Sequence, residues 1–93
     1  MALPSKKCEH LQALNPLSLK RARTYSCEEC IKTGGEWVHL RTCQSCGITL
    51  CCDSSPNKHA RKHFHREEHP VVISAEPGEY WAWCYADKTL REF

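Results

Sequence analysis

Short alternating and apolar stretches along the chain predict a small β-sheet. Residues 36–42 alternate between two faces, as expected of a half-buried strand. Residues 47–50 predict a second strand, and the β-branched run at residues 71–74 predicts a third. The aromatic stretch at residues 80–85 predicts the last strand, with only a short tail after it.

One main helix is predicted between the second and third of these strands. Ser55 is a favourable N-cap residue, Pro56 suits the first helical position, and the helix is expected to continue to about Arg66. Residues 11–23, interrupted by Pro16, predict a loop with at most one turn of helix. The pattern therefore predicts an α+β fold, in which a short, twisted antiparallel sheet packs with one main helix.

The chain is short, and its cysteine content changes this picture. It has 93 residues, with 8 cysteines and 6 histidines. We expect one domain over residues 1–93, with flexible ends at residues 1–7 and 91–93. A chain of this length buries only about two thirds of its unfolded surface, so disulfides or metals often supplement the core.

The surroundings of the cysteines favour metal over disulfides. The first residues contain no apolar segment typical of a secretory signal, and no later run reaches the ~18 apolar residues of a membrane span. We therefore expect a cytoplasmic protein that does not bind membranes, and thiols stay reduced in that compartment. Cysteines in CxxC pairs, accompanied by histidines, then predict metal sites.

Zinc is the metal that thiolates and imidazoles in this spacing favour, and each structural zinc takes four ligands. The candidate ligands are Cys8, His10, Cys27, Cys30, Cys43, Cys46, Cys51, Cys52, His59, His63, His69 and Cys84. These are too many for one ion, so two or three sites are expected. Four protein ligands leave no open position for water or substrate, and we expect no enzymatic activity.

One subset of these residues has the spacing of a DNA-reading Cys2His2 finger. The subset is Cys43-x2-Cys46-x12-His59-x3-His63. Pro56 stands where such a finger carries its core leucine, and a proline there would break the recognition helix. This interpretation also leaves Cys27, Cys30 and Cys51 without a metal, so we disfavour it.

The full ordered string of ligands resembles the UBP-type zinc finger, the ubiquitin-binding domain attached to deubiquitinating enzymes and to a histone deacetylase. The string reads Cys8-x-His10, Cys27-x2-Cys30, Cys43-x2-Cys46-Gly47, Cys51, His59-x3-His63, His69-Pro70 and Trp83-Cys84-Tyr85. The resemblance implies one zinc held by Cys27, Cys30, Cys51 and His59. It implies a second held by Cys43, Cys46, His63 and His69. A third would use Cys8, His10, Cys84 and Asp87, the last standing where the family has a cysteine. Cys52 stays open as the alternative to Cys51.

The resemblance also implies a pocket that captures the free C-terminal Gly-Gly of ubiquitin between aromatic walls, with an arginine on the carboxylate. Trp83 and Tyr85 occupy the wall positions, whereas Asp53 stands where the family has its arginine. Arg41 replaces a family tryptophan and could supply the positive charge, and Trp37 lies four residues earlier. We therefore expect a non-catalytic, monomeric module that binds the C-terminal tail of a peptide or protein, with a ubiquitin-like tail as one candidate.

Two other functions remain as alternatives. The helix residues Arg61, Lys62 and Arg66 could form a nucleic-acid patch, although the net charge of +2 is small for a nucleic-acid binder. A metal- or redox-responsive protein could use Cys52 as a reactive thiol, or could release zinc from the site that contains Asp87.

Overall fold

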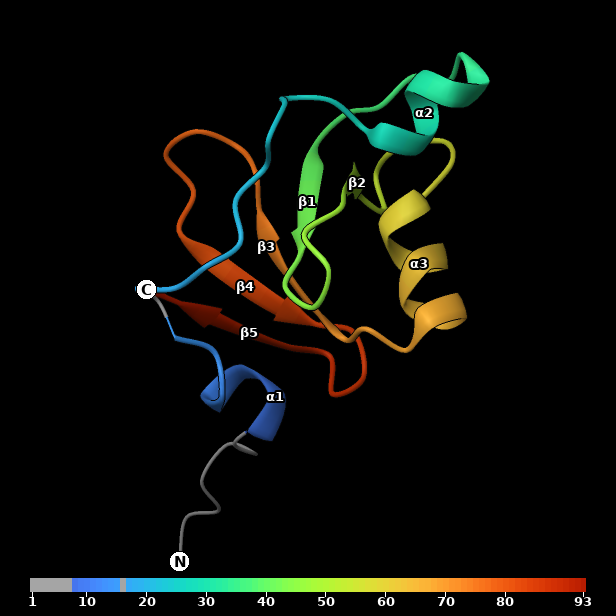
Figure 1. Ribbon diagram of the computed structural model, residues 1–93. Helices are drawn as coiled ribbons and strands as arrows, with labels where there is room; N and C mark the ends of the chain where they lie inside the picture. The colour runs from blue at the N-terminus through green and yellow to red at the C-terminus, as the bar shows by residue number, and fades with distance from the viewer. Residues whose placement is uncertain (1–7, 16) are drawn as a thin grey trace, which may run out of the picture.

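The computed structural model describes residues 8–15 and 17–93. Its centre is a five-stranded antiparallel sheet with the strand order β2-β1-β3-β4-β5 (Figure 1). The strands are β1 Leu40–Cys43, β2 Thr49–Cys51, β3 Val71–Ser74, β4 Trp81–Cys84 and β5 Thr89–Glu92. The helices are α1 Glu9–Gln12, α2 Glu28–Thr33 and α3 His59–Glu67. The predicted α+β fold with a small antiparallel sheet is thus confirmed.

The two faces of the sheet are covered by different segments. Directly opposed residues of antiparallel strands share a face, so Val72 and Trp83 lie on one face, whereas Ile73 and Ala82 lie on the other. The first face packs against α3 in a cluster that contains Ala60, Leu50, Val72 and Tyr85. The second packs against α1 through Leu11, Val71, Ile73 and Ala82. In Figure 1, α3 accordingly lies beside β2, while α1 lies near β4 and β5.

Helix α3 begins at His59 rather than at Pro56. The Ser55 hydroxyl does not cap the helix, because it accepts a hydrogen bond from the Val38 amide at 2.8 Å. Lys58, the residue before the helix, has a left-handed backbone with φ 48°. Residues 53–57 therefore form a loop tied to the segment before β1, and β1 itself begins at Leu40 instead of Glu36.

Helix α2 was not predicted from the sequence. Its N-cap is Cys27, whose sulfur accepts a hydrogen bond from the Cys30 amide at 3.3 Å. Cysteine is not among the usual capping residues, so the local pattern gave no start signal. The helix ends at Gly34 with φ 73°, the conformation in which glycine commonly terminates helices.

Strand β5 replaces most of the flexible tail expected at residues 91–93. Arg91 pairs with Ala82, and its guanidinium donates to the carbonyl oxygens of Leu11 and Leu14 at 2.8 and 3.1 Å. The Phe93 amide donates to the Tyr80 carbonyl at 3.0 Å. The expectation for residues 1–7 lies outside the described residues. Within the described ranges, no helix has the length and apolarity needed to cross a membrane.

Candidate metal centres and an adjoining aromatic cavity

Four side chains from α2, β2 and α3 converge in a first metal-binding group: Cys27, Cys30, Cys51 and His59. The Nδ1 atom of His59 lies 3.4, 3.3 and 3.4 Å from the sulfurs of Cys27, Cys30 and Cys51. With Zn–S bonds of about 2.3 Å and Zn–N bonds of about 2.0–2.1 Å, a tetrahedron places neighbouring ligands about 3.4–3.8 Å apart. The donor atoms therefore fit a zinc ion.

The structure also separates Cys51 from its neighbour. Cys51 is the last residue of β2 and joins the first group, whereas the Cys52 sulfur lies 3.7 Å from the Ser55 hydroxyl. Successive residues of an extended chain point to opposite sides, which explains the division. Of the two alternatives left open by the sequence, the structure places Cys51 among the potential ligands.

A second group joins the end of β1 to α3 and the segment that follows it. Its members are Cys43, Cys46, His63 and His69. The Cys46 sulfur lies 3.5 Å from His63 Nε2, the Cys43 sulfur lies 3.6 Å from His69 Nδ1, and the two histidine nitrogens are 3.2 Å apart. Burial, with the neighbouring charges of His69 and Arg66, lowers the pKa of His63 and favours the neutral imidazole that binds metals.

A third group ties α1 to the β4–β5 hairpin. Its members are Cys8, His10, Cys84 and Asp87. Asp87 Oδ2 lies 2.8 Å from the Cys8 sulfur, 3.1 Å from His10 Nδ1 and 3.8 Å from the Cys84 sulfur. These distances are less uniform than in the other groups, and the His10 and Asp87 side chains are 47% and 42% exposed. The set still offers four competent zinc ligands, since a carboxylate oxygen can complete a site.

Burial makes thiols in all three groups harder to ionise. It raises the pKa of Cys30 to about 12, and it also raises the pKa values of Cys43, Cys51 and Cys84. In the absence of a metal these thiols hold their protons at neutral pH, and zinc must displace the protons in order to bind.

A cavity of about 180 Å³ opens beside these groups, on the face of the sheet that carries Trp83. It is lined by Arg41, Cys52, Asp53, Ser54, Trp81, Trp83, Tyr85 and Leu90, and we call it the aromatic cavity. Four of the five residues predicted for ligand binding meet here. The fifth, Trp37, does not line this cavity, because β1 starts after it and its side chain packs against the core cluster around Leu40 and Leu50.

Trp81 was not among the residues predicted for ligand binding, although the alternation of β4 is a signal for it. Trp81 precedes Trp83 by two residues on β4 and therefore shares its face. The guanidinium carbon of Arg41 lies 4.5 Å from the centre of the Trp81 ring, and its Nη1 donates to the Leu40 carbonyl at 2.8 Å. The ring and the carbonyl hold this cation at the cavity wall.

The aromatic residues at the bottom of the cavity are packed against one another. Trp83 and Tyr85 meet edge to face with ring centres 6.4 Å apart, and Tyr85 stacks on Phe64 of α3 at 5.4 Å. Burial, reinforced by the charge of Asp53, raises the pKa of the Tyr85 hydroxyl, which therefore stays neutral. Tyr85 therefore adds no charge to the wall of the aromatic cavity, to which Arg41 and Asp53 contribute charges of opposite sign.

Cys52 also lines the aromatic cavity but is buried, with 4% of its surface exposed. Burial opposes ionisation of its thiol. Hydrogen bonds from the Ser55 hydroxyl and from the backbone of Ser54 and His39, together with the Arg41 charge, outweigh burial and lower the pKa to about 7. The limited exposure restricts access of a redox partner to this sulfur.

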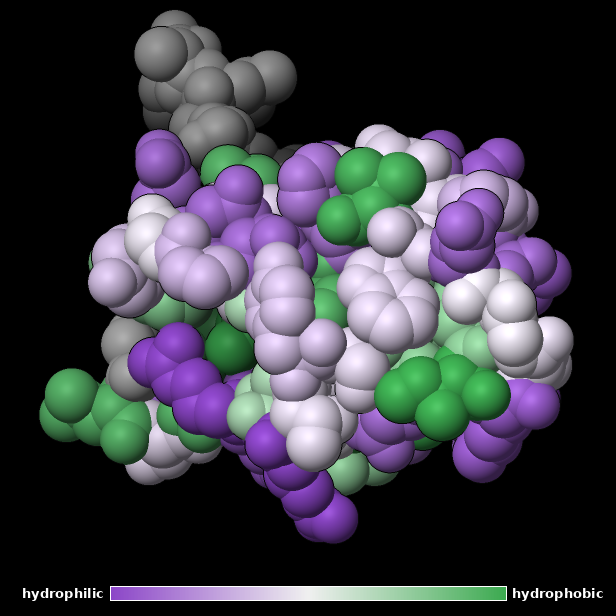
Figure 2. Space-filling model, turned by 90° about the horizontal axis from the view of Figure 1, so that it is seen from above, coloured by the Kyte–Doolittle hydropathy of each residue, from purple (hydrophilic) through white to green (hydrophobic). Residues whose placement is uncertain are grey.

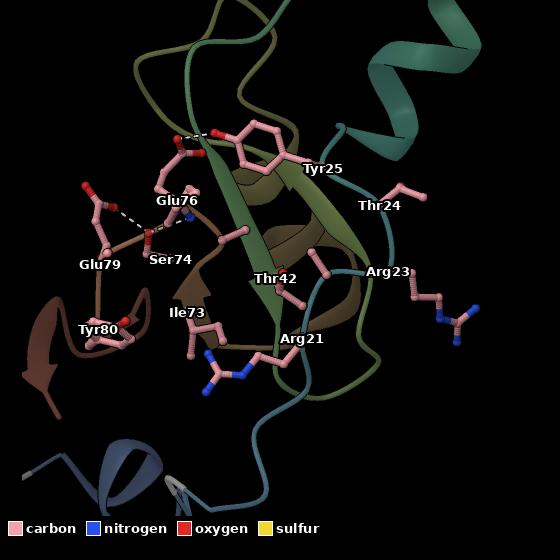
Figure 3. Close-up of a pocket in the computed structure, with 14 residues that line it drawn as sticks. Arg21, Arg23, Thr24, Tyr25, Thr42, Ile73, Ser74, Glu76, Glu79 and Tyr80 are labelled. Atoms are coloured by element: carbon pink, nitrogen blue, oxygen red, sulfur yellow. Dashed lines mark hydrogen bonds between the residues drawn. The ribbon is translucent and has the colours of Figure 1, made fainter.

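A larger cavity of about 330 Å³ lies on the opposite face of the sheet, between residues 21–25 and the turn that precedes β4 (Figure 3). Several polar side chains that line it are already engaged in hydrogen bonds within the protein. The Tyr25 hydroxyl donates to Glu76, which also accepts from the Leu40 amide, and the Ser74 hydroxyl donates to Glu79. Arg23 points away from the cavity in Figure 3. The contact with Glu76 links Tyr25 to the segment that follows β3, and none of the residues predicted for ligand binding lines this cavity.

Apolar side chains outside the cavities are scattered. Figure 2 shows separate apolar areas among polar ones on the face it displays. Leu17, Ile31 and Val38 are among the exposed apolar residues of the described chain. This surface does not resemble the broad contiguous patch that marks a large apolar interface.

Comparison with known proteins agrees with the presence of zinc-binding groups in this chain. The family described as "Zn-finger in ubiquitin-hydrolases and other protein" matches residues 27–92. The solution NMR structure of protein RPA1320 from Rhodopseudomonas palustris is similar, with a TM-score of 0.79 and 40% identity over 96% of this chain and 84% of that one.

Two curated relatives are enzymes. NAD-dependent deacetylase sir2A of Dictyostelium discoideum is 31% identical over 75% of this chain and 12% of its own length. Ubiquitin carboxyl-terminal hydrolase 44 of Ailuropoda melanoleuca is 30% identical over 85% of this chain and 10% of its own length. The chain thus spans about a tenth of these relatives, over a zinc-binding module that is itself non-catalytic. The chain belongs to the family of zinc fingers found in ubiquitin hydrolases and other proteins.

Proposed function

We propose that this zinc finger is a non-catalytic module that binds the free C-terminal end of another polypeptide in the aromatic cavity. The observation that carries the proposal is the position of Arg41, which is held over Trp81 in the wall of a cavity whose other aromatic walls are Trp83 and Tyr85. An arginine in a partly dry site is the group that recognises a carboxylate through charge-assisted hydrogen bonds.

The size of the cavity indicates what kind of tail would enter. Its volume of about 180 Å³ is below the about 300–1,000 Å³ of typical small-molecule sites. Flat aromatic walls and a small volume favour residues without bulky side chains, of which glycine is the smallest. A tail that ends in Gly-Gly, as in ubiquitin, is therefore one suitable ligand, and the name of one relative, a ubiquitin carboxyl-terminal hydrolase, is consistent with it.

The three groups of Cys, His and Asp side chains would each hold one zinc ion in this proposal. The first group would connect α2 and β2 to α3, the second β1 to α3, and the third α1 to the hairpin that carries Trp81 and Trp83. With four protein ligands each, the zinc ions would be structural and would have no free coordination position for a substrate. Their role would be to hold the cavity walls in place.

The nucleic-acid alternative is less well supported by the contacts of α3. Arg61 forms an ion pair with Asp53 at 3.0 Å, and Arg66 forms one with Glu67 at 3.1 Å. Two of the three basic residues of that patch are thus neutralised. A cytoplasmic, monomeric protein remains part of the proposal.

The decisive experiment is an NMR titration of the zinc-loaded protein with acetyl-Leu-Ala-Gly-Gly as the free acid and as the C-terminal amide. We expect the free acid to shift the resonances of Arg41, Trp81 and Trp83, and the amide to bind at least about fivefold more weakly, since it lacks the charge that Arg41 recognises. The Arg41→Gln variant should remove the difference between the two peptides. An exposed arginine outside the cavity, Arg66, provides the matched control Arg66→Gln, which should retain the difference.

Equal binding of acid and amide by the unmodified protein would contradict carboxylate capture. Binding of neither peptide would contradict the proposed function for Gly-Gly tails. A parallel titration with a short RNA and a short DNA duplex tests the alternative, because strong, salt-dependent binding there would replace the tail-binding proposal.

A further inference from the structure

The aromatic cavity shares a wall with a second hollow in the surface. This second hollow has a volume of about 340 Å³ and is lined by Arg61, Phe64, His65, Trp83, Tyr85 and Lys88; we call it the basic cavity. Trp83 and Tyr85 line both cavities. A peptide lying across this pair of rings would therefore contact both cavities.

The charges along this combined surface are unequal. Three cationic side chains, Arg41, Arg61 and Lys88, face a single carboxylate, Asp53. Asp53 is already engaged by Arg61. Lys88, in the turn between β4 and β5, has no carboxylate within ion-pair distance among the residues that the structure describes. The basic cavity thus has an excess of positive charge that the protein itself does not neutralise.

The environment of the basic cavity would strengthen an ion pair formed in it. Its aromatic side, built from Phe64 stacked on Tyr85 and from Trp83, excludes water from one side of the cationic groups. Electrostatic attraction grows as water is displaced from around a pair of charges. An acidic side chain of a bound peptide would therefore find both a cationic partner and apolar contact for its methylene groups.

We propose that the module selects tails that carry an acidic side chain a short distance before the C-terminus, with that side chain seated in the basic cavity against Lys88. This inference rests on the proposed function, because the C-terminal residues would occupy the aromatic cavity. The aromatic cavity and the basic cavity adjoin along Trp83 and Tyr85, and an extended chain advances about 3.3 Å per residue. The acidic residue would then stand about two positions before the terminal residue.

The same surface would discriminate against a basic residue at that position. A peptide arginine or lysine there would approach Lys88, and like charges repel. The preferred partner is thus a protein with an acidic residue before a small C-terminal pair. It differs in charge from a tail that reads Leu-Arg-Gly-Gly.

The test compares acetyl-Leu-Glu-Gly-Gly with acetyl-Leu-Arg-Gly-Gly, both as free acids, on the zinc-loaded protein at low salt. We expect the glutamate peptide to bind about 3- to 10-fold more tightly, the size expected when one exposed attraction replaces one repulsion. The Lys88→Glu variant should abolish or reverse this preference. Lys62→Glu is the matched control, because Lys62 is exposed on α3, carries the same charge and lines neither cavity.

The outcomes separate this inference from the proposed function. Tight binding of both peptides with equal affinity, or tighter binding of the arginine peptide, would overturn the acidic preference while leaving tail binding intact. Retention of the preference in Lys88→Glu would show that the basic cavity is not its source and would also overturn the inference. Failure of both peptides and of the neutral Leu-Ala-Gly-Gly peptide would reject tail binding itself. Zinc content and amide dispersion of the Lys88→Glu protein confirm that it is folded before its affinities are compared.

Discussion

Asp53, in the loop after β2, forms an ion pair with Arg61 of α3, with Oδ2 and Nη2 3.0 Å apart. By the resemblance of the ligand string, Asp53 stands where an arginine is expected, and a carboxylate there on its own opposes capture of a negatively charged tail. The pairing changes this conclusion, because Arg61 neutralises Asp53 and leaves Arg41 as the cation that faces the aromatic cavity. Both side chains are about half exposed, so the pair contributes little to stability and its effect is expected on ligand binding.

Removal of the Asp53 charge should strengthen binding of a free C-terminus. We expect Asp53→Asn to raise the affinity for acetyl-Leu-Ala-Gly-Gly about two- to fivefold, and Arg61→Gln to lower it by a similar factor, as befits exposed charges. Isothermal titration at two salt concentrations measures both effects. A weaker affinity in Asp53→Asn would mean that Asp53 contacts the ligand directly.

Trp81 should contribute to binding without being needed for folding. Trp81→Ala removes the ring that holds the Arg41 guanidinium, and the affinity for the same peptide should fall about 3- to 10-fold, in line with a cation–π contact. Trp37→Ala is the comparison, because Trp37 packs on the core. That variant should lower the Tm and leave the affinity of the folded protein unchanged. An equal loss of affinity in both variants would contradict the assignment of Trp81.

Removal of metal should unfold the domain. The three ligand groups connect α1, α2 and α3 to the sheet. Loss of zinc removes the cross-links that a short chain needs, so metal binding and folding become one equilibrium. Excess chelator should collapse the dispersion of the amide resonances, and added zinc should restore it. A dispersed spectrum that persists in the metal-free protein would refute a zinc-dependent fold.

The third group should bind zinc independently of the second. Asp87→Ala removes one of its four donors, and zinc content should fall by about one ion per chain, since a site with three ligands is much weaker. Elemental analysis gives the stoichiometry, and the amide resonances around His63 report on the second group. Asp53→Ala, which removes a carboxylate outside the groups, is the control. An unchanged zinc content in Asp87→Ala would exclude Asp87 as a ligand.

Zinc binding should weaken as the pH falls. Burial raises the pKa of Cys30 to about 12 and raises those of Cys51 and Cys43 as well. Without metal these thiols are protonated at neutral pH, so each zinc that binds releases protons, and a higher proton concentration favours release of the ion. Transfer of zinc to a chromogenic chelator should increase steadily from about pH 8 to about pH 5. Transfer that is independent of pH would mean that the buried thiols are not the ligands.

Local spacing was sufficient to predict much of the fold and of the candidate ligands. The β-branched run at residues 71–74 gave β3 with its observed bounds, because strand residues have strong local preferences. Two cysteines separated by two residues can meet in a single turn, so Cys27 with Cys30 and Cys43 with Cys46 were identifiable as pairs. Their assignment to particular distant histidines came from resemblance to a family, because sequence spacing by itself does not say which segments approach one another.

The sequence by itself determined the strand-forming segments, the CxxC turns and the presence of Arg41, Trp83 and Tyr85 in one strand-rich region. Tertiary contacts decided the rest. Ser55 accepts a hydrogen bond from Val38 instead of capping a helix, and α3 begins at His59. The Cys51 side chain points toward α2, so the neighbouring Cys52 lines the aromatic cavity. Because β1 begins only at Leu40, Trp37 lies before the strand and packs on the core. Trp81 and Trp83 lie two residues apart on β4 and share a face, so Trp81 lies against Arg41. Each of these outcomes depends on which distant segments pack together, and the free energy of such contacts exceeds the small local preferences that a sequence pattern expresses.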